Sequence, residues 1–138
     1  MEGTIEELIA GHEYEEAAVK AQSLIQLQPQ VAKWHAYLGL AKFRLEKFDE
    51  AVPALKTAVT LDPHFEDALV KLAQCFDRLH LSHECALVVH DALHQFPANH
   101  ALQGLWQAHG HNFYADKENW ERGANPFRHQ IFMGGDPR

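Results

Sequence analysis

The amino-acid sequence predicts an all-α solenoid, built from stacked helix–turn–helix repeats. Three prolines, Pro29, Pro63 and Pro97, stand 34 residues apart, and the residues before each proline recur in the same phase. Reading back from each one gives Tyr14-Glu15-Glu16-Ala17, Phe48-Asp49-Glu50-Ala51 and Ser82-His83-Glu84-Cys85. A constant period of this length is typical of a repeat whose unit is a pair of helices.

The helical spacing of apolar residues predicts the bounds of each element. The first repeat is expected to have a short helix over residues 4–10, which ends at Gly11, and a partner over residues 13–27. The second repeat is expected to have helices over 31–45 and 49–61, and the third over 65–79 and 83–95. Asn99 is a suitable N-cap for a further helix over 100–109, whose sequence leaves the repeat pattern as a capping helix does.

The second repeat carries the pattern most completely. Leu38-Gly39 lies near its start, Phe48-Asp49-Glu50-Ala51 opens its second helix, and Ala58 precedes Leu61-Asp62-Pro63 at its end. Gly39 and Ala51 are small enough for paired helices to approach closely, and Pro63 cannot continue a helix. Over roughly residues 4–111 the chain resembles the tetratricopeptide repeat (TPR) family. The resemblance implies a TPR-type α-solenoid of about three repeats, with a C-terminal capping helix and an irregular tail.

The predicted organisation is a solenoid with its capping helix over residues 1–111 and an aromatic-rich C-terminal tail over residues 112–138. After Gly110, glycines and prolines interrupt the sequence, and no helical period continues beyond a turn at 116–121. The tail nevertheless contains apolar side chains that a linker lacks, namely Phe113, Tyr114, Trp120, Phe127, Ile131, Phe132 and Met133. We expect the tail to dock on its own solenoid or on a neighbouring subunit, which leaves a homo-oligomer or a larger complex open.

The net charge and the distribution of apolar residues indicate which classes of partner are not expected. A formal net charge of −7 argues against nucleic acid or an anionic membrane as the main partner. No stretch approaches the ~20 apolar residues of a transmembrane helix, so membrane insertion is not expected. The N-terminal residues lack the basic and apolar regions of a signal peptide, which predicts a cytoplasmic location.

The expected function is that of a non-catalytic protein–protein interaction module, an adaptor or assembly factor that binds a peptide or a subunit in its concave groove. The first helix of each repeat is expected to face this groove, and the candidate residues are Lys33, Tyr37, Leu40, Arg44, Val70, Lys71, Gln74 and Arg78. Such a strip suits a peptide with a hydrophobic anchor and a charged flank. Leu40 and Phe43 fit the core between repeats equally well. A small secretion or assembly chaperone is the alternative among binding proteins.

One activity of the TPR family can be compared position by position. Co-chaperone TPR domains hold the acidic C-terminus of heat-shock chaperones with five Lys, Asn and Arg side chains. The resemblance places Glu2, Glu6, Tyr37, Asp67 and Lys71 at those positions. Only Lys71 has a suitable charge, and the three acidic residues would repel an acidic chain end. This clamp is therefore not expected here.

Eleven histidines raise an alternative of another class, a histidine-rich metal-binding protein. His83, His90 and His94 lie on one side of the predicted helix 83–95, which we expect to face solvent. His90 and His94 have the four-residue spacing at which two imidazoles can share a zinc ion. Asp91 follows His90 where a metalloprotease motif has Glu. Histidines on exposed helices more often bind no metal ion than act as ligands, so neither a metal nor another cofactor is expected.

The remaining candidates for chemistry have structural interpretations. Cys75 and Cys85 occupy small-residue positions that face one another between the paired helices of the third repeat, and we expect two buried free thiols. A disulfide is disfavoured in the cytosol. The sequence contains no nucleophile with its base, glycine-rich phosphate loop or paired-carboxylate site, so no enzymatic activity is expected.

Overall fold

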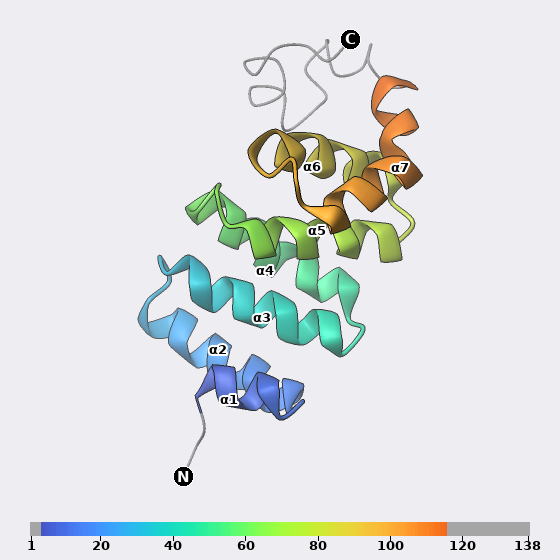
Figure 1. Cartoon of the computed structure of the whole chain (residues 1–138). Helices are drawn as coiled ribbons and strands as arrows, with labels where there is room; N and C mark the ends of the chain where they lie inside the picture. The colour runs from blue at the N-terminus through green and yellow to red at the C-terminus, as the bar shows by residue number, and fades with distance from the viewer. Residues whose placement is uncertain (1–3, 116–138) are drawn as a thin grey trace.

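In the computed structural model, residues 4–115 are described, and they form seven helices without any strand (Figure 1). The helices are α1 (Ile5–Ala10), α2 (Tyr14–Leu27), α3 (Ala32–Arg44), α4 (Phe48–Leu61), α5 (Glu66–Arg78), α6 (Ser82–Gln95) and α7 (His100–Ala115). Each helix packs against the next one along the chain. The predicted all-α solenoid is thereby confirmed, and six of the seven helices end within one residue of their predicted bounds.

The helices divide into two sets. Besides its sequence neighbours, α3 contacts α5, and α5 contacts α7. The first helices of successive repeats therefore lie side by side and form one continuous face of the solenoid. The second helices, α2, α4 and α6, follow the opposite side.

The turn within each helix pair is the same in all three repeats. Its central residue has a positive φ of 63° at His12, 61° at Glu46 and 61° at His80. The next residue donates a backbone hydrogen bond to the carbonyl five positions earlier, from Glu13 to Leu8, from Lys47 to Lys42 and from Leu81 to Phe76. This is the Schellman end of a helix, here with non-glycine residues in the left-handed conformation.

The turn between repeats also recurs. The last helical bond runs from Gln28 N–H to Leu24 O, from Asp62 N–H to Ala58 O and from Phe96 N–H to Ala92 O, at 2.7, 2.9 and 2.8 Å. A proline follows each of these residues. Because proline has no N–H to donate, each second helix ends where the sequence predicts.

Small residues allow the paired helices to pack closely. Gly39 of α3 faces Leu55 of α4, and Ala51 is 0% exposed. Cys75 and Cys85 are free, fully buried thiols in the same core, and Cys85 Sγ donates to Ala73 O at 3.4 Å. The close approach at Gly39 and the burial of both thiols agree with the sequence prediction.

The end of α7 differs from its predicted position. The helix continues past residue 109 to Ala115, because the Trp106 ring lies over Gly110 and Phe113 is buried against Ala86 and Leu87 of α6. Its start agrees with the prediction, since Asn99 Oδ1 accepts a hydrogen bond from Leu102 N–H at 3.0 Å. Most of the predicted tail lies outside the described residues, so its docking and the division of the chain at residue 111 stay predictions.

One further property of the helices concerns membranes. Within residues 4–115, no helix is both long enough and apolar enough to span a bilayer.

Candidate partner-binding groove

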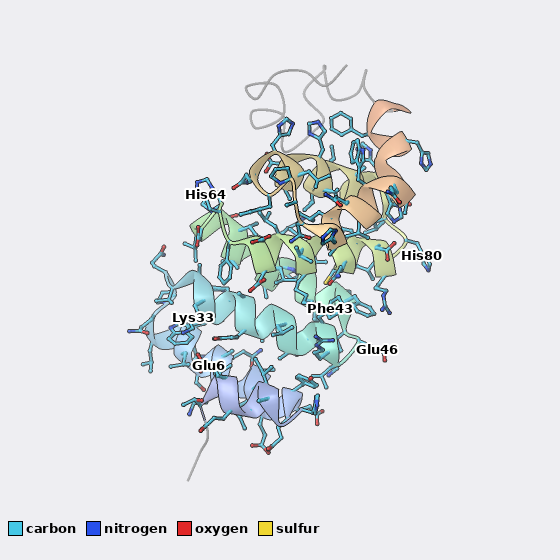
Figure 2. The ribbon with its side chains drawn as sticks, viewed as in Figure 1. Glu6, Lys33, Phe43, Glu46, His64 and His80 are labelled. Atoms are coloured by element: carbon cyan, nitrogen blue, oxygen red, sulfur yellow. The ribbon has the colours of Figure 1, made fainter. Side chains whose placement is uncertain are left out.

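A hollow of about 440 Å³ lies on the face formed by α3, α5 and α7. Figure 2 shows Phe43 at the carboxyl end of α3, on the side toward α5. The hollow is lined by Phe43, Arg44, Lys71, Gln74, Asp77, Arg78, His100, Ala101, Gly104 and Leu105. Four of the eight groove residues expected from the sequence are among them, namely Arg44, Lys71, Gln74 and Arg78.

The other four expected residues lie elsewhere on these helices. Lys33 and Tyr37 are joined to α1, because Glu6 Oε2 lies 3.2 Å from Lys33 Nζ and accepts a hydrogen bond from the Tyr37 hydroxyl at 2.9 Å (Figure 2). Burial and the Glu6 carboxylate raise the pKa of Tyr37 to about 12. Val70 packs against the core, and Leu40 is half-buried. The residues expected to form one strip are thus separated: Lys33 and Tyr37 contact α1, whereas Arg44, Lys71, Gln74 and Arg78 line the hollow.

Three cationic side chains that line the hollow lie over two aromatic rings, of which one, Phe43, also lines it. The Phe43 and Phe48 rings meet edge to face with centroids 5.3 Å apart. Lys71 Nζ lies 5.0 Å from the Phe43 centroid, and the Arg44 guanidinium lies 5.9 Å from it. Arg78 lies 5.6 Å from the Phe48 centroid. A cation over an aromatic face is attracted by the ring quadrupole, so these contacts hold the charges at the rim of the hollow.

Lys71 is the most buried of these cations. Burial lowers the pKa of its ammonium group, and the nearby positive charge of Arg44 lowers it further, while the Asp67 carboxylate opposes both. Lys71 Nζ also donates to Gln74 Oε1 at 3.4 Å. The surroundings of Lys71 therefore favour the arrival of a negative charge.

The acidic residue of the hollow, Asp77, is bound to α7. His109 Nε2 lies 2.6 Å from Asp77 Oδ1, and His109 Nδ1 lies 3.1 Å from the Ser82 hydroxyl. These are the residue types of a Ser–His–Asp triad, but Nδ1 rather than Nε2 of the ring faces the serine. Because the three residues come from α5, α6 and α7, we interpret them as a tie between helices.

Sequence reasoning missed the contribution of α7 to the hollow. The lining residues His100, Ala101, Gly104 and Leu105 each follow a residue of α5 by 34 positions, namely Glu66, Asp67, Val70 and Lys71. The helix that was expected only to cap the solenoid thus stands where the first helix of a fourth repeat would stand. Extending the same period once more would have identified this wall.

The histidines of α6 are arranged differently from the prediction. The expectation of a solvent-facing helix is wrong at His90, which is 5% exposed because α7 covers it and Phe113 stacks on its ring at 4.0 Å. His94 is exposed, with its ring centroid 4.8 Å from that of His90. Among the side chains described by the structure, no group of three or more His, Cys, Asp or Glu is placed to hold a metal ion.

Comparison with known proteins agrees with this architecture. The solved TPR domain of Arabidopsis OM64 matches with a TM-score of 0.72 and 18% sequence identity, over 76% of this chain and 87% of that domain. At this identity the likeness concerns the fold. A search of curated proteins found no match. The family model described as "Psidin, N-terminal TPR repeats region" matches residues 4–117, and the chain therefore belongs to this family of TPR proteins.

Proposed function

We propose that this TPR module is a non-catalytic adaptor or assembly factor, which holds a peptide or a subunit of a larger complex on the face of α3, α5 and α7. The TPR fold is in general that of a protein–protein interaction module. The observation that supports this particular surface is the hollow of about 440 Å³, which lies on the side where the first helices meet.

The lining of the hollow suits side chains of an extended partner segment. Phe43 and Leu105 offer apolar surface, while Arg44, Lys71 and Arg78 offer charge. Binding sites commonly combine an apolar anchor with a few polar groups that set orientation. The volume is within the ~300–1,000 Å³ that ligand pockets occupy, which is room for a few side chains.

Gly104 permits a test that blocks the hollow without altering the core. A Cβ atom at this position would meet nothing within 4 Å, so a side chain there would extend into open space. We expect Gly104→Trp to fold normally and to lose partner binding, because the indole fills the hollow. Gly104→Ala is the matched control, since a methyl group leaves most of the volume free.

The measurement is the capture of native partners by the three proteins, followed by affinity measurement for each captured partner. Partners held by the wild type and by Gly104→Ala, but lost with Gly104→Trp, would support the hollow as the site. Circular dichroism verifies that all three proteins are helical. Equal capture by Gly104→Trp would show that partners bind on another surface.

A further inference from the structure

The hollow concentrates positive charge in an acidic chain. The formal net charge of the protein is −7, yet Arg44, Lys71 and Arg78 all line the hollow. Asp77 is the carboxylate among its described lining residues, and this group is bound to His109 at 2.6 Å. Within residues 4–115, no carboxylate lies at ion-pair distance from any of the three cations. Among the described residues, three positive charges therefore line the hollow without an ion pair to a carboxylate, although Asp67 acts on Lys71 at longer range.

The positions of the three cations indicate more than one negative group. Arg44 and Arg78 occupy the last turns of α3 and α5, one repeat apart, and Lys71 belongs to the turn of α5 before Gln74. His100 and Ala101, which begin α7, also line the hollow, so the positive end of that helix dipole contributes to its lining. Phe43 and Leu105 supply apolar surface next to these charges.

We propose that the hollow selects a partner segment with two neighbouring Asp or Glu side chains beside an apolar residue. The two carboxylates would lie among Arg44, Lys71 and Arg78, and guanidinium groups suit carboxylates because they donate two parallel hydrogen bonds. The apolar residue would pack on Phe43 and Leu105. This inference rests on the proposed function, and it adds the chemistry of the partner.

Of the acidic residues that argued against a chaperone-type clamp, the two that the structure describes, Glu6 and Asp67, do not line this hollow. Glu6 is paired with Lys33 and Tyr37 at the other end of α3, and Asp67 is absent from the lining. The hollow and the clamp positions share Lys71. Because Glu6 and Tyr37 stand where a clamp holds a terminal carboxylate, the groups recognised here are side chains rather than a chain end.

The test uses an array of C-terminally amidated decapeptides, in which acidic, neutral, basic, phosphorylated and apolar positions are varied independently. The full-length protein is expected to retain peptides with two adjacent acidic residues next to an apolar one, and to lose them when Glu is replaced by Gln. Affinity for the best peptide should fall by about tenfold for each of Arg44→Ala, Lys71→Ala and Arg78→Ala. Binding should also weaken as salt is added.

Lys56→Ala is the matched control. Lys56 Nζ also lies over an aromatic ring, 5.7 Å from the Phe76 centroid, but this residue is on α4 and outside the hollow. Its removal changes the net charge equally and should leave the affinity unchanged. If Lys56→Ala lowered the peptide affinity as much as the three other substitutions, the effect would arise from the overall charge of the protein. This result would contradict the proposal.

The remaining outcomes separate this inference from the proposed function. If the wild type retains neutral or basic peptides, and Gly104→Trp no longer binds them, the hollow is a binding site without a preference for acidic residues. This outcome would support the proposed function and would overturn the present inference. Binding only to phosphorylated peptides, or only to peptides with a free C-terminal carboxylate, would also overturn the preference for Asp and Glu side chains. Failure of every peptide, together with partner capture that is insensitive to Gly104→Trp, would overturn both.

Discussion

At the scale of single residues, Gly39 marks the closest approach of α3 and α4. A Cβ atom at this position would lie 2.4 Å from Leu55 Cγ, and Leu55 is itself 1% exposed. Protein interiors are close-packed, so Leu55 has little space into which to move. The same substitution therefore has opposite consequences at Gly39 and at Gly104, although both residues are inside helices.

We predict that Gly39→Ala lowers the free energy of unfolding by ~1–3 kcal/mol, because the overpacking outweighs the better helix propensity of alanine. Gly104→Ala should raise it by up to ~1 kcal/mol, since no atom opposes the new methyl group. Urea unfolding of the two variants and the wild type measures both values. Equal shifts in the same direction would contradict the packing at Gly39.

The two thiols give the stability a defined dependence on alkaline pH. Burial raises the pKa of Cys75 and of Cys85 from 9.0 to about 12. Between these values the unfolded thiols lose their protons while the folded thiols keep them. The folded state then binds more protons than the unfolded state, so the free energy of unfolding must fall as pH rises above 9.

The check is urea unfolding at about pH 8 and about pH 10.5, with a Cys75→Ala/Cys85→Ala double variant as control. The wild type should lose more stability between these conditions than the double variant does. Tyr37, whose pKa is also raised to about 12, contributes to the decline of both proteins. A decline of the same size in both would show that the thiols do not ionise on unfolding as argued.

At the scale of elements, the join between α5 and α6 shows how one repeat departs from the pattern. Asp77 and Ser82 occupy the positions that Phe43 and Phe48 hold in the second repeat, 34 residues earlier. The aromatic pair packs edge to face, whereas the polar pair is bridged by His109 of α7. The third repeat thus exchanges an apolar contact for hydrogen bonds that hold the following helix.

A double-mutant cycle of Asp77→Ala and His109→Ala measures this tie. We expect a coupling energy of ~0.5–3 kcal/mol, because the two side chains share a 2.6 Å hydrogen bond that is lost when either one is removed. The free energy of unfolding of the two single variants and the double variant supplies the value. Additive effects would show that Asp77 and His109 act independently.

At the scale of the whole molecule, α7 completes the solenoid over α6. In a stack of repeats each unit is stabilised mainly by its neighbours, so the terminal helix protects an otherwise exposed face. Phe113 is 3% exposed and packs with Ala86 and Leu87, and Leu102 is buried in the main core. The last turn of α7 is therefore expected to stabilise α6 as well as itself.

Two truncations separate this helix from the residues that follow it. Ending the chain after His111 removes Phe113 and should lower the free energy of unfolding by ~3 kcal/mol or more relative to ending it after Ala115. Comparison of the Ala115 truncation with the full chain then tests the predicted docking of the tail. Unchanged stability, oligomeric state and partner binding after loss of residues 116–138 would contradict that docking.

The sequence by itself determined where the helices begin and where six of the seven end, together with their pairing into repeats. Pro29, Pro63 and Pro97 each end a helix because a missing N–H acts on the nearest turn, and Asn99 caps α7 through a bond to a residue three positions away. The repeat period also placed Lys71, Gln74 and Arg78 on one face of one helix. Such features depend on interactions within a few residues, which the order of amino acids specifies directly.

Only the tertiary structure decided which residues from different helices share a site. Lys33 and Tyr37 meet Glu6, and Asp77 meets His109, across 27 to 32 positions of the chain. His90 is buried, against expectation, because α7 extends to Ala115 and places Phe113 on its ring. These outcomes depend on the length and packing of neighbouring helices. The faces that two helices bury against one another decide which side chains meet, and the 34-residue period of the sequence does not specify those faces.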